Sequence, residues 1–190
     1  MSTIKSVSTY SKPEQHNCKN LFKQEFNPEK PNLVWVNDIT YVKVAGRFAY
    51  ICVIIDLFSK KVIAYKTSTK INTQIVLDCF SLTYTRRGYP KGVLFHSDRG
   101  CQYTSKEFRE AIDKAEFVQS FSARAHPFDN AVAESFFKYL EKEELNRKTF
   151  NSISELNLSL SEYIEGFYNK NRPHSANHFL SPNEREDAFL

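Results

Sequence analysis

The sequence predicts an α/β protein in which a mixed five-stranded sheet is flanked by helices. Three segments rich in β-branched and aromatic residues follow one another with only short turns between them, which favours an antiparallel meander. After these segments, helical and strand patterns alternate, and such alternation is typical of strands joined by helical crossovers. Together the two observations predict the element order β-β-β-α-β-α-β-α-α.

Turn residues separate the strands of the meander. Pro28 and Pro31 precede the first strand, Gly46 lies in the turn that follows it, and the pair Lys60-Lys61 marks the next turn. The second strand is almost wholly apolar. The predicted strands are Leu33–Tyr41, Phe48–Asp56 and Val62–Thr67.

Helices and short strands follow the meander. The first helix should end near Arg87, because Gly88 and Pro90 stop it. Later helices are predicted where apolar residues recur at helical spacing, and short strands where the chain is briefly apolar. The predicted helices are Thr73–Arg87, Ser105–Ala115, Asp129–Leu145 and Ile153–Tyr168, and the strands are Val93–His96 and Phe117–Phe121.

The composition is that of a globular protein with one core. Of 190 residues, 41% are hydrophobic and 25% are charged. No apolar run approaches the roughly 20 residues that cross a bilayer, so we expect no membrane span. The four cysteines form no CxxC pair, which argues against structural zinc and a disulfide framework and favours a cytoplasmic protein. A net charge of +4 permits a polyanionic partner without requiring one.

The chain divides into two parts of different composition. Residues 1–31 are polar and are expected to form a loosely ordered lead-in, a remnant of an upstream region, with a short helix near Lys19–Phe26. Residues 32–190 contain all the predicted strands and the amphipathic helices, and they form the predicted core domain.

Three acidic residues lie in segments whose other residues are mostly apolar. Asp38 is in the first strand, Asp98 follows the fourth, and Glu134 is in the helix after the fifth. A buried carboxylate without a partner is unfavourable, so it becomes protonated, pairs or binds a cation. Three converging carboxylates are the hard oxygen ligands that Mg²⁺ or Mn²⁺ prefers. Each residue alone is equally well explained as a surface, capping or ion-paired residue, so the interpretation depends on all three.

Five motifs between about Pro31 and Leu190 resemble the catalytic core of insertion-sequence transposases of the OrfB type, a family related to retroviral integrases. The resemblance includes the 35 residues between Asp98 and Glu134. It implies a ribonuclease H-like fold for residues 32–190. The motifs are Trp-Val-Asn-Asp-Ile-Thr at 35–40, Ile-Asp-Leu-Phe-Ser-Lys-Lys at 55–61, His-Ser-Asp-Arg-Gly-Cys-Gln-Tyr-Thr-Ser at 96–105, Asp-Asn-Ala-Val-Ala-Glu-Ser-Phe-Phe-Lys at 129–138 and Tyr-Asn-Lys-Asn-Arg-Pro-His-Ser at 168–175.

The resemblance also implies a reaction. Asp38, Asp98 and Glu134 would be the catalytic residues and would hold two Mg²⁺ or Mn²⁺ ions, with Asp38 shared between the ions. Two such ions about 3.5–4 Å apart activate the attacking oxygen and stabilise the leaving oxygen. The substrate would be double-stranded DNA, which is cleaved by water at a transposon end and then joined through its 3′-OH to target DNA.

Basic residues near the acidic set are expected to bind the DNA. Lys138 follows Glu134 by one helical turn, Arg124 lies in the loop at 122–128, and Lys142 follows one turn later on the same helix. For Lys138 and Arg124, an ordinary solvated side chain remains the alternative. Relatives often have lysine where this chain has Glu141, so a negative charge is expected near the DNA phosphates, with Lys142 compensating for it.

Other residues in the motifs are expected to serve the structure. His96 should make a structural hydrogen bond, and Asp56 should be structural. Gly100 should supply a turn conformation that other residues resist. Asn130, with Asp129, should cap the helix that follows.

The resemblance suggests partners as well as a substrate. Full-length relatives carry an upstream helix-turn-helix region that recognises transposon ends, and only about 30 residues precede the core here. End recognition is therefore expected from a separate upstream helix-turn-helix polypeptide, and a homo-oligomer is expected because relatives act as multimers on paired ends. Two alternatives remain open: a non-catalytic, truncated DNA-binding fragment that regulates a full-length transposase, and a ribonuclease H-like nuclease.

Overall fold

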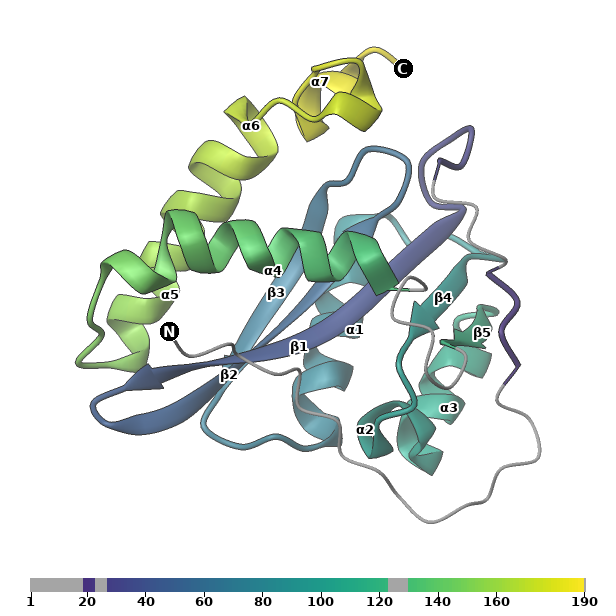
Figure 1. Cartoon of the computed structure of the whole chain (residues 1–190). Coiled ribbons are helices and arrows are strands. Elements are labelled where there is room, and N and C mark those ends of the chain that lie inside the picture. Colours follow the sequence, from purple (N-terminus) through teal and green to yellow (C-terminus); the bar gives the residue numbers. More distant parts are fainter. Residues whose placement is uncertain (1–18, 23–26, 123–129, 190) are drawn as a thin grey trace.

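The computed structural model describes residues 19–22, 27–122 and 130–189, and it contains one mixed five-stranded sheet (Figure 1). The strand order is β3-β2-β1-β4-β5. The first three strands pair antiparallel as a meander, whereas β4 runs parallel to β1 and β5 runs parallel to β4. The strands are β1 Val34–Val44, β2 Arg47–Asp56, β3 Val62–Ser68, β4 Leu94–Ser97 and β5 Val118–Phe121. The predicted mixed sheet is therefore confirmed.

Helices cover both faces of this sheet. Figure 1 shows α4 in front of the strands and α1 and α3 behind them. Alternate residues of each strand enter the two cores, so that Val36 packs with α4 and Trp35 packs with α1 and α3. The helices are α1 Thr73–Arg86, α2 Cys101–Thr104, α3 Lys106–Lys114, α4 Ala131–Glu143, α5 Ile153–Ser161, α6 Asn169–Asn171 and α7 Pro182–Asp187.

The first hairpin is longer than predicted. β1 continues to Val44 instead of ending near Tyr41, because β2 begins at Arg47 and pairs with it to the end. Ala45 and Gly46 form the two-residue turn, both with positive φ, at 47° and 78°. That backbone matches the twist of the paired strands.

The chain after α4 is more varied than the single helix predicted from Ile153 to Tyr168. α5 passes into a π-helical segment, Glu162–Tyr168, before α6. Short 3₁₀ turns at Leu145–Arg147 and Ser175–Asn177 accompany these elements. No helix in the described parts of the chain is long and apolar enough to span a membrane.

Part of the predicted lead-in packs against the core. Phe22 is buried, and its ring lies 4.9 Å from that of His96. The main-chain N–H of Phe121 donates to the carbonyl of Lys19 at 3.0 Å. Residues 19–22 are not helical, so the helix predicted near Lys19–Phe26 is wrong for these four residues, and its remainder lies outside the described residues.

Candidate active site

Asp38 lies on β1, and Asp98 lies immediately after the end of β4, the parallel strand beside it. The register pairs Val36 of β1 with His96 of β4, and each aspartate lies two residues further on. Side chains two residues apart on a strand project from the same face, and Val36 belongs to the core under α4. The sheet therefore directs both carboxylates toward the face that α4 covers.

The Asp38 carboxylate lies in an unfavourable electrostatic environment. Burial and then the neighbouring charge of Asp98 raise its pKa to about 8, and the charge of Glu134 adds to this. Its Oδ1 accepts a local hydrogen bond from the N–H of Ile39 at 2.8 Å. Within the described parts of the chain, no ion pair joins Asp38 to a basic side chain. Among the described residues, Asp38 is therefore a buried carboxyl group with no compensating positive charge, and its raised pKa favours the protonated form.

Asp98 is held by the tight turn that follows β4. Its Oδ1 accepts the N–H of Gly100 at 2.9 Å, and burial raises its pKa. Gly100 has a φ of −57°, so the predicted need for an unusual turn conformation is wrong. The need is for space, because a Cβ there would lie 2.8 Å from Oε1 of Gln102 and 3.0 Å from Oδ1 of Asp98.

Hydrogen bonds fix the same segment to β5. The ring nitrogens of His96 contact two serine hydroxyls, Nδ1 with Oγ of Ser120 at 3.0 Å and Nε2 with Oγ of Ser122 at 3.1 Å. Arg99 Nε donates to the carbonyl of Ser122 at 2.9 Å. The structural role predicted for His96 is confirmed, and it holds the strand that presents Asp98.

Glu134 lies on the first turn of α4, beside a shallow cavity of about 300 Å³ that we call the acidic hollow. Glu141 also faces the hollow and accepts a hydrogen bond from Oγ1 of Thr40 at 3.4 Å. Burial raises the pKa of both Glu134 and Glu141. The residues that line the hollow are Asp38, Ile39, Thr40, Glu134, Phe137, Lys138 and Glu141.

The sheet and α4 bring the three acidic residues near one another without closing them around one point. Asp38 and Glu134 share the hollow, while Asp98 acts on Asp38 through its charge. Among the described residues, no three acidic, histidine or cysteine side chains lie close enough to hold a metal ion as they stand.

The basic residues predicted to bind DNA fall in different places. Lys138 lines the acidic hollow with Asp38 and Glu134. Lys142 is exposed further along α4 and outside the hollow, and Arg124 lies outside the described residues.

Two other structural expectations have opposite outcomes. Asn130 stands at the N-cap position of α4, but its side chain makes no capping bond, so that prediction is wrong; Asp129 lies outside the described residues. Asp56 is structural, as predicted, because it is fully buried, lies 3.4 Å from the Arg87 guanidinium and accepts the N–H of Phe58.

Sequence reasoning gave no role to a cluster that anchors the end of α4. Arg172 donates twice to Glu143, from Nη2 to Oε1 at 2.9 Å and from Nε to Oε2 at 3.2 Å. Its guanidinium carbon also lies 3.7 Å from the centre of the Tyr139 ring, and the Tyr163 hydroxyl donates to Glu143. The motif at 168–175 indicated only that the tail packs against the core.

Two insertion-sequence transposases match most of the chain. The transposase for insertion sequence element IS904 of Lactococcus lactis subsp. lactis (strain IL1403) is 34% identical over 167 residues, which are 88% of this chain and 66% of that protein. Transposase InsF for insertion sequence IS3A of Escherichia coli (strain K12) is 35% identical over 172 residues, covering 90% of this chain and 60% of the relative. The chain thus spans slightly less than two thirds of these relatives' length.

Solved structures show the same fold. The catalytic core domain of HTLV-2 integrase in complex with magnesium has a TM-score of 0.62 at 18% identity, covering 84% of this chain and 99% of that one. The Mos1 transposase catalytic domain with Raltegravir and Mn has a TM-score of 0.60 at 16% identity and covers 72% of each chain. The predicted ribonuclease H-like architecture is thereby confirmed.

The family follows from matches along the sequence. Residues 28–127 match the family model described as "Integrase core domain", and residues 116–182 match a second model of that description. The two matches contain Asp38, Asp98 and Glu134 in order. This chain is a member of the integrase core domain family.

Proposed function

We propose that this chain is the catalytic core of an insertion-sequence transposase, with residues 32–190 as the core and residues 1–31 as a lead-in. It cleaves DNA at transposon ends and transfers the freed 3′-OH strand to target DNA. The observation that carries the proposal is that Asp38 and Glu134 share one hollow of an integrase-core fold and that Asp98 lies near enough to act on Asp38 through its charge. Among the described residues, Asp38 has no ion-pair partner.

The three acidic residues fit a hard divalent cation. Asp38, Asp98 and Glu134 would hold Mg²⁺ or Mn²⁺ as two ions, because all three offer oxygen ligands and their mutual repulsion is relieved by positive charge. The ions would supply stabilisation of the negative charge that develops on the reacting phosphate. Solved relatives in complex with magnesium and with Mn support this choice of ions.

The chain's own residues position the DNA for this chemistry. In cleavage, a water oxygen forms a bond to phosphorus while the P–O3′ bond breaks, and a 3′-OH is freed. In strand transfer the oxygen of that hydroxyl forms a bond to a target phosphorus while the target P–O3′ bond breaks, and the target strand leaves with a free 3′-OH. Lys138, on the same side of α4 as Glu134, would contact a flanking phosphate. Arg124 and Lys142 would extend the positive surface along the strand.

The partners follow from the relatives. We assign recognition of the transposon end to an upstream helix-turn-helix polypeptide, and we expect two or more copies of this chain to act on paired ends in the cytoplasm. Support comes from the relatives, which are insertion-sequence transposases longer than this chain.

The test is cleavage of a labelled DNA duplex that carries the terminal sequence of the element. With Mn²⁺ or Mg²⁺ the wild-type protein should nick the end and join it to other DNA. Asp38→Asn, Asp98→Asn and Glu134→Gln should each lose at least about 100-fold in rate, since metal ions contribute several kcal/mol and each 1.36 kcal/mol is tenfold. Glu141→Gln is the matched control, because it removes a charge from the same hollow outside the triad.

Three outcomes would contradict the proposal or part of it. Residual cleavage above about a tenth of the wild-type rate in Asp98→Asn would remove that residue from the site. Absence of nicking and joining, unchanged after fusion to an end-recognition domain, would favour the non-catalytic regulatory fragment. Cleavage without joining would favour the nuclease.

A further inference from the structure

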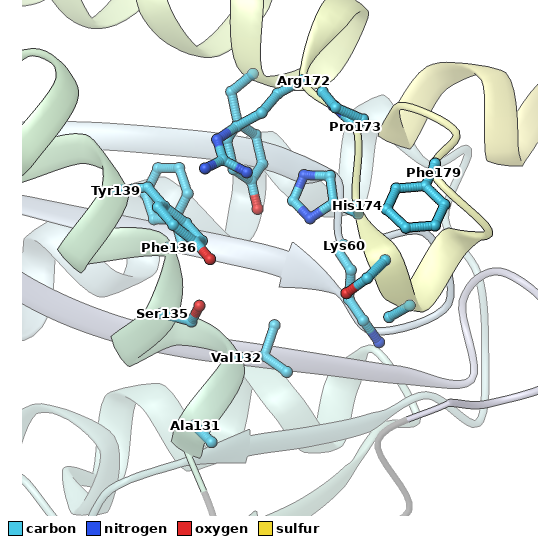
Figure 2. Close-up of a pocket in the computed structure, with 13 residues that line it drawn as sticks. Lys60, Ala131, Val132, Ser135, Phe136, Tyr139, Arg172, Pro173, His174 and Phe179 are labelled. Atoms are coloured by element: carbon cyan, nitrogen blue, oxygen red, sulfur yellow. The ribbon is translucent and has the colours of Figure 1, made fainter.

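A second cavity, of about 520 Å³, lies on the other side of α4 from the acidic hollow. Figure 2 shows Val132, Ser135 and Tyr139 along α4 on one side of it, and His174 and Phe179 from the tail on the other. We call it the tail pocket. Because Glu134 and Ser135 are consecutive, the two cavities flank the same turn of one helix. One DNA strand could therefore contact both the hollow and the tail pocket.

The wall of the tail pocket is both cationic and aromatic. Lys60 and Arg172 line it, and the Arg172 guanidinium stacks on the Tyr139 ring. Burial lowers the pKa of His174 to about 4; the charges of Arg172 and Lys60 act in the same direction, and the charge of Glu143 opposes them. The imidazole is therefore neutral at physiological pH, while Lys60, whose pKa burial lowers to about 8, keeps most of its charge.

His174 offers an unused hydrogen-bonding atom at this wall. Its Nε2 is buried and has no hydrogen-bond partner within the described residues. An unsatisfied polar atom in a protein interior is unfavourable, so this ring nitrogen favours a hydrogen bond with a water or a ligand that enters the cavity. Ser135 and Ser175 add hydroxyl groups to the same lining.

Phe179 is held at the mouth of the pocket in a strained conformation. It is 74% exposed and has a φ of 65°, a region that bulky residues avoid. Its N–H donates to the carbonyl of His174 at 2.9 Å, and the Asn177 side chain donates to the carbonyl of Ser59, so the turn is fixed. An exposed aromatic ring on a strained backbone adds no stability to the folded chain. We take this as a sign that the ring contacts a ligand.

We infer that the tail pocket binds an unpaired nucleotide of the DNA strand held at the acidic hollow. The base would stack on Phe179, its edge would bond to His174, and its phosphate would face Lys60 and Arg172. Aromatic faces combined with cations are the elements with which proteins bind unpaired nucleotides. The cavity volume is in the range of small-ligand sites. This inference rests on the proposed function, and it adds that the protein recognises an unpaired nucleotide in its DNA substrate.

The experiment compares two duplexes of the same end sequence, one blunt and one with a short single-stranded extension. Binding is measured by fluorescence anisotropy in EDTA, so that no cleavage occurs. Wild type should bind the extended duplex about tenfold more tightly, since stacking of one base is worth about 1–3 kcal/mol, or 5- to 150-fold. Phe179→Ala and Phe179→Asn should reduce this preference to about onefold and leave affinity for the blunt duplex unchanged.

Two variants guard against a folding artefact. Asn tolerates positive φ, so Phe179→Asn should keep or raise the melting temperature while it removes the ring. Phe48→Ala is the matched control: Phe48 is 49% exposed, and it lies on the opposite face of the sheet, where Tyr41 contacts it. It should keep the preference for the extended duplex.

The outcomes separate this inference from the proposed function. The pocket assignment is overturned if the wild-type protein binds both duplexes equally, even if cleavage is normal. It is also overturned if the Phe179 variants still prefer the extended duplex. A preference that depends on Phe179 in a protein that neither cleaves nor joins DNA supports the pocket and refutes the transposase. A protein that binds neither duplex, and still binds neither after fusion to an end-recognition domain, refutes both.

Discussion

The main-chain N–H of Gly100 donates a 2.9 Å hydrogen bond to Oδ1 of Asp98, and a Cβ at position 100 would lie 3.0 Å from that same oxygen. One close approach therefore both orients the carboxylate and excludes a side chain. The carboxylate that this turn holds adjoins Asp38 on the next strand. Its orientation is thus set by a residue that carries no functional group.

Gly100→Ala should reduce DNA cleavage at least about tenfold while the protein stays folded. The added methyl group must displace Asp98 or Gln102, and such overpacking typically costs about 1–3 kcal/mol. Cleavage rate and melting temperature would be measured together. Gly166→Ala is the control, because a Cβ there meets no atom within 4 Å and should be neutral or slightly stabilising. Full activity in Gly100→Ala would show that the close approach does not matter.

Asp38→Asn should stabilise the metal-free protein and abolish its stabilisation by Mg²⁺ or Mn²⁺. The folded-state pKa is raised to about 8 from an ordinary value of 3.8, so the native state binds more protons than the unfolded state between these values. Wild-type stability should therefore fall as pH rises from about 4 to about 8. Mg²⁺ should offset this loss, with a larger effect at the alkaline end.

The measurement is thermal unfolding across this pH range with and without Mg²⁺. We expect the free energy of unfolding of Asp38→Asn to exceed that of the wild type by about 1–2 kcal/mol at pH 8 without metal. For a chain of this size, each kcal/mol raises the melting temperature by about 2–4 °C. If Mg²⁺ changes the wild-type melting temperature at neither end of the pH range, Asp38 does not bind a divalent cation.

Lys138→Ala should weaken DNA binding and reduce its dependence on salt by about one phosphate contact, a slope change of about 0.9. The reason is that Lys138 stands in the hollow beside Glu134. Affinity would be measured over a series of salt concentrations. Lys114→Ala, on the exposed end of α3 across the sheet, is the control. An unchanged slope for Lys138→Ala would assign this lysine to solvent.

Local patterns predicted most of the fold because the strand and helix patterns in the sequence agree with the elements that form. Strand alternation and the Gly46 turn predicted the meander, and Gly88 indicated the end of α1. α2 was not predicted, since one turn is too short to show a period. α7 was not predicted although Ser181 and Glu184 form a capping box with Pro182 in the first turn.

The site was predictable only in part. From the motifs, Asp38, Asp98 and Glu134 are predicted as the site, and this stays a prediction. The contact between Arg172 and Glu143 joins positions 29 residues apart and depends on how the tail folds back. Nor does the sequence around Asn130 reveal that its side chain will not cap α4. Such contacts arise from tertiary packing, which local propensity does not encode.

Arg172→Lys and Glu143→Gln should each destabilise the protein by about 1–2 kcal/mol, and a double-mutant cycle should give a coupling of about 1 kcal/mol. Lysine cannot reproduce the paired donation or the stacking on Tyr139. Chemical denaturation of the four proteins measures the coupling.

The control for this cycle is Arg86 with Glu165, an ion pair at 3.0 Å whose side chains are 43% and 42% exposed. Exposed pairs contribute little, so its coupling should be no more than about 0.5 kcal/mol. Equal coupling in the two cycles would show that burial and stacking add nothing to the Arg172 contact.

His174 should make the protein less stable in mild acid. Its pKa is lowered to about 4 from 6.5, by burial and by the charges of Arg172 and Lys60, with Glu143 acting in the opposite direction. The unfolded state therefore binds more protons between these values, and stability is lost as pH falls from about 6.5 to about 4. His174→Gln should remove about 1–3 kcal/mol of that pH-dependent loss in denaturation experiments at a series of pH values. His178→Gln, at an exposed position of the same tail, should retain the wild-type pH dependence. If both variants follow the wild-type curve, the His174 ring is not shielded from solvent in the folded protein.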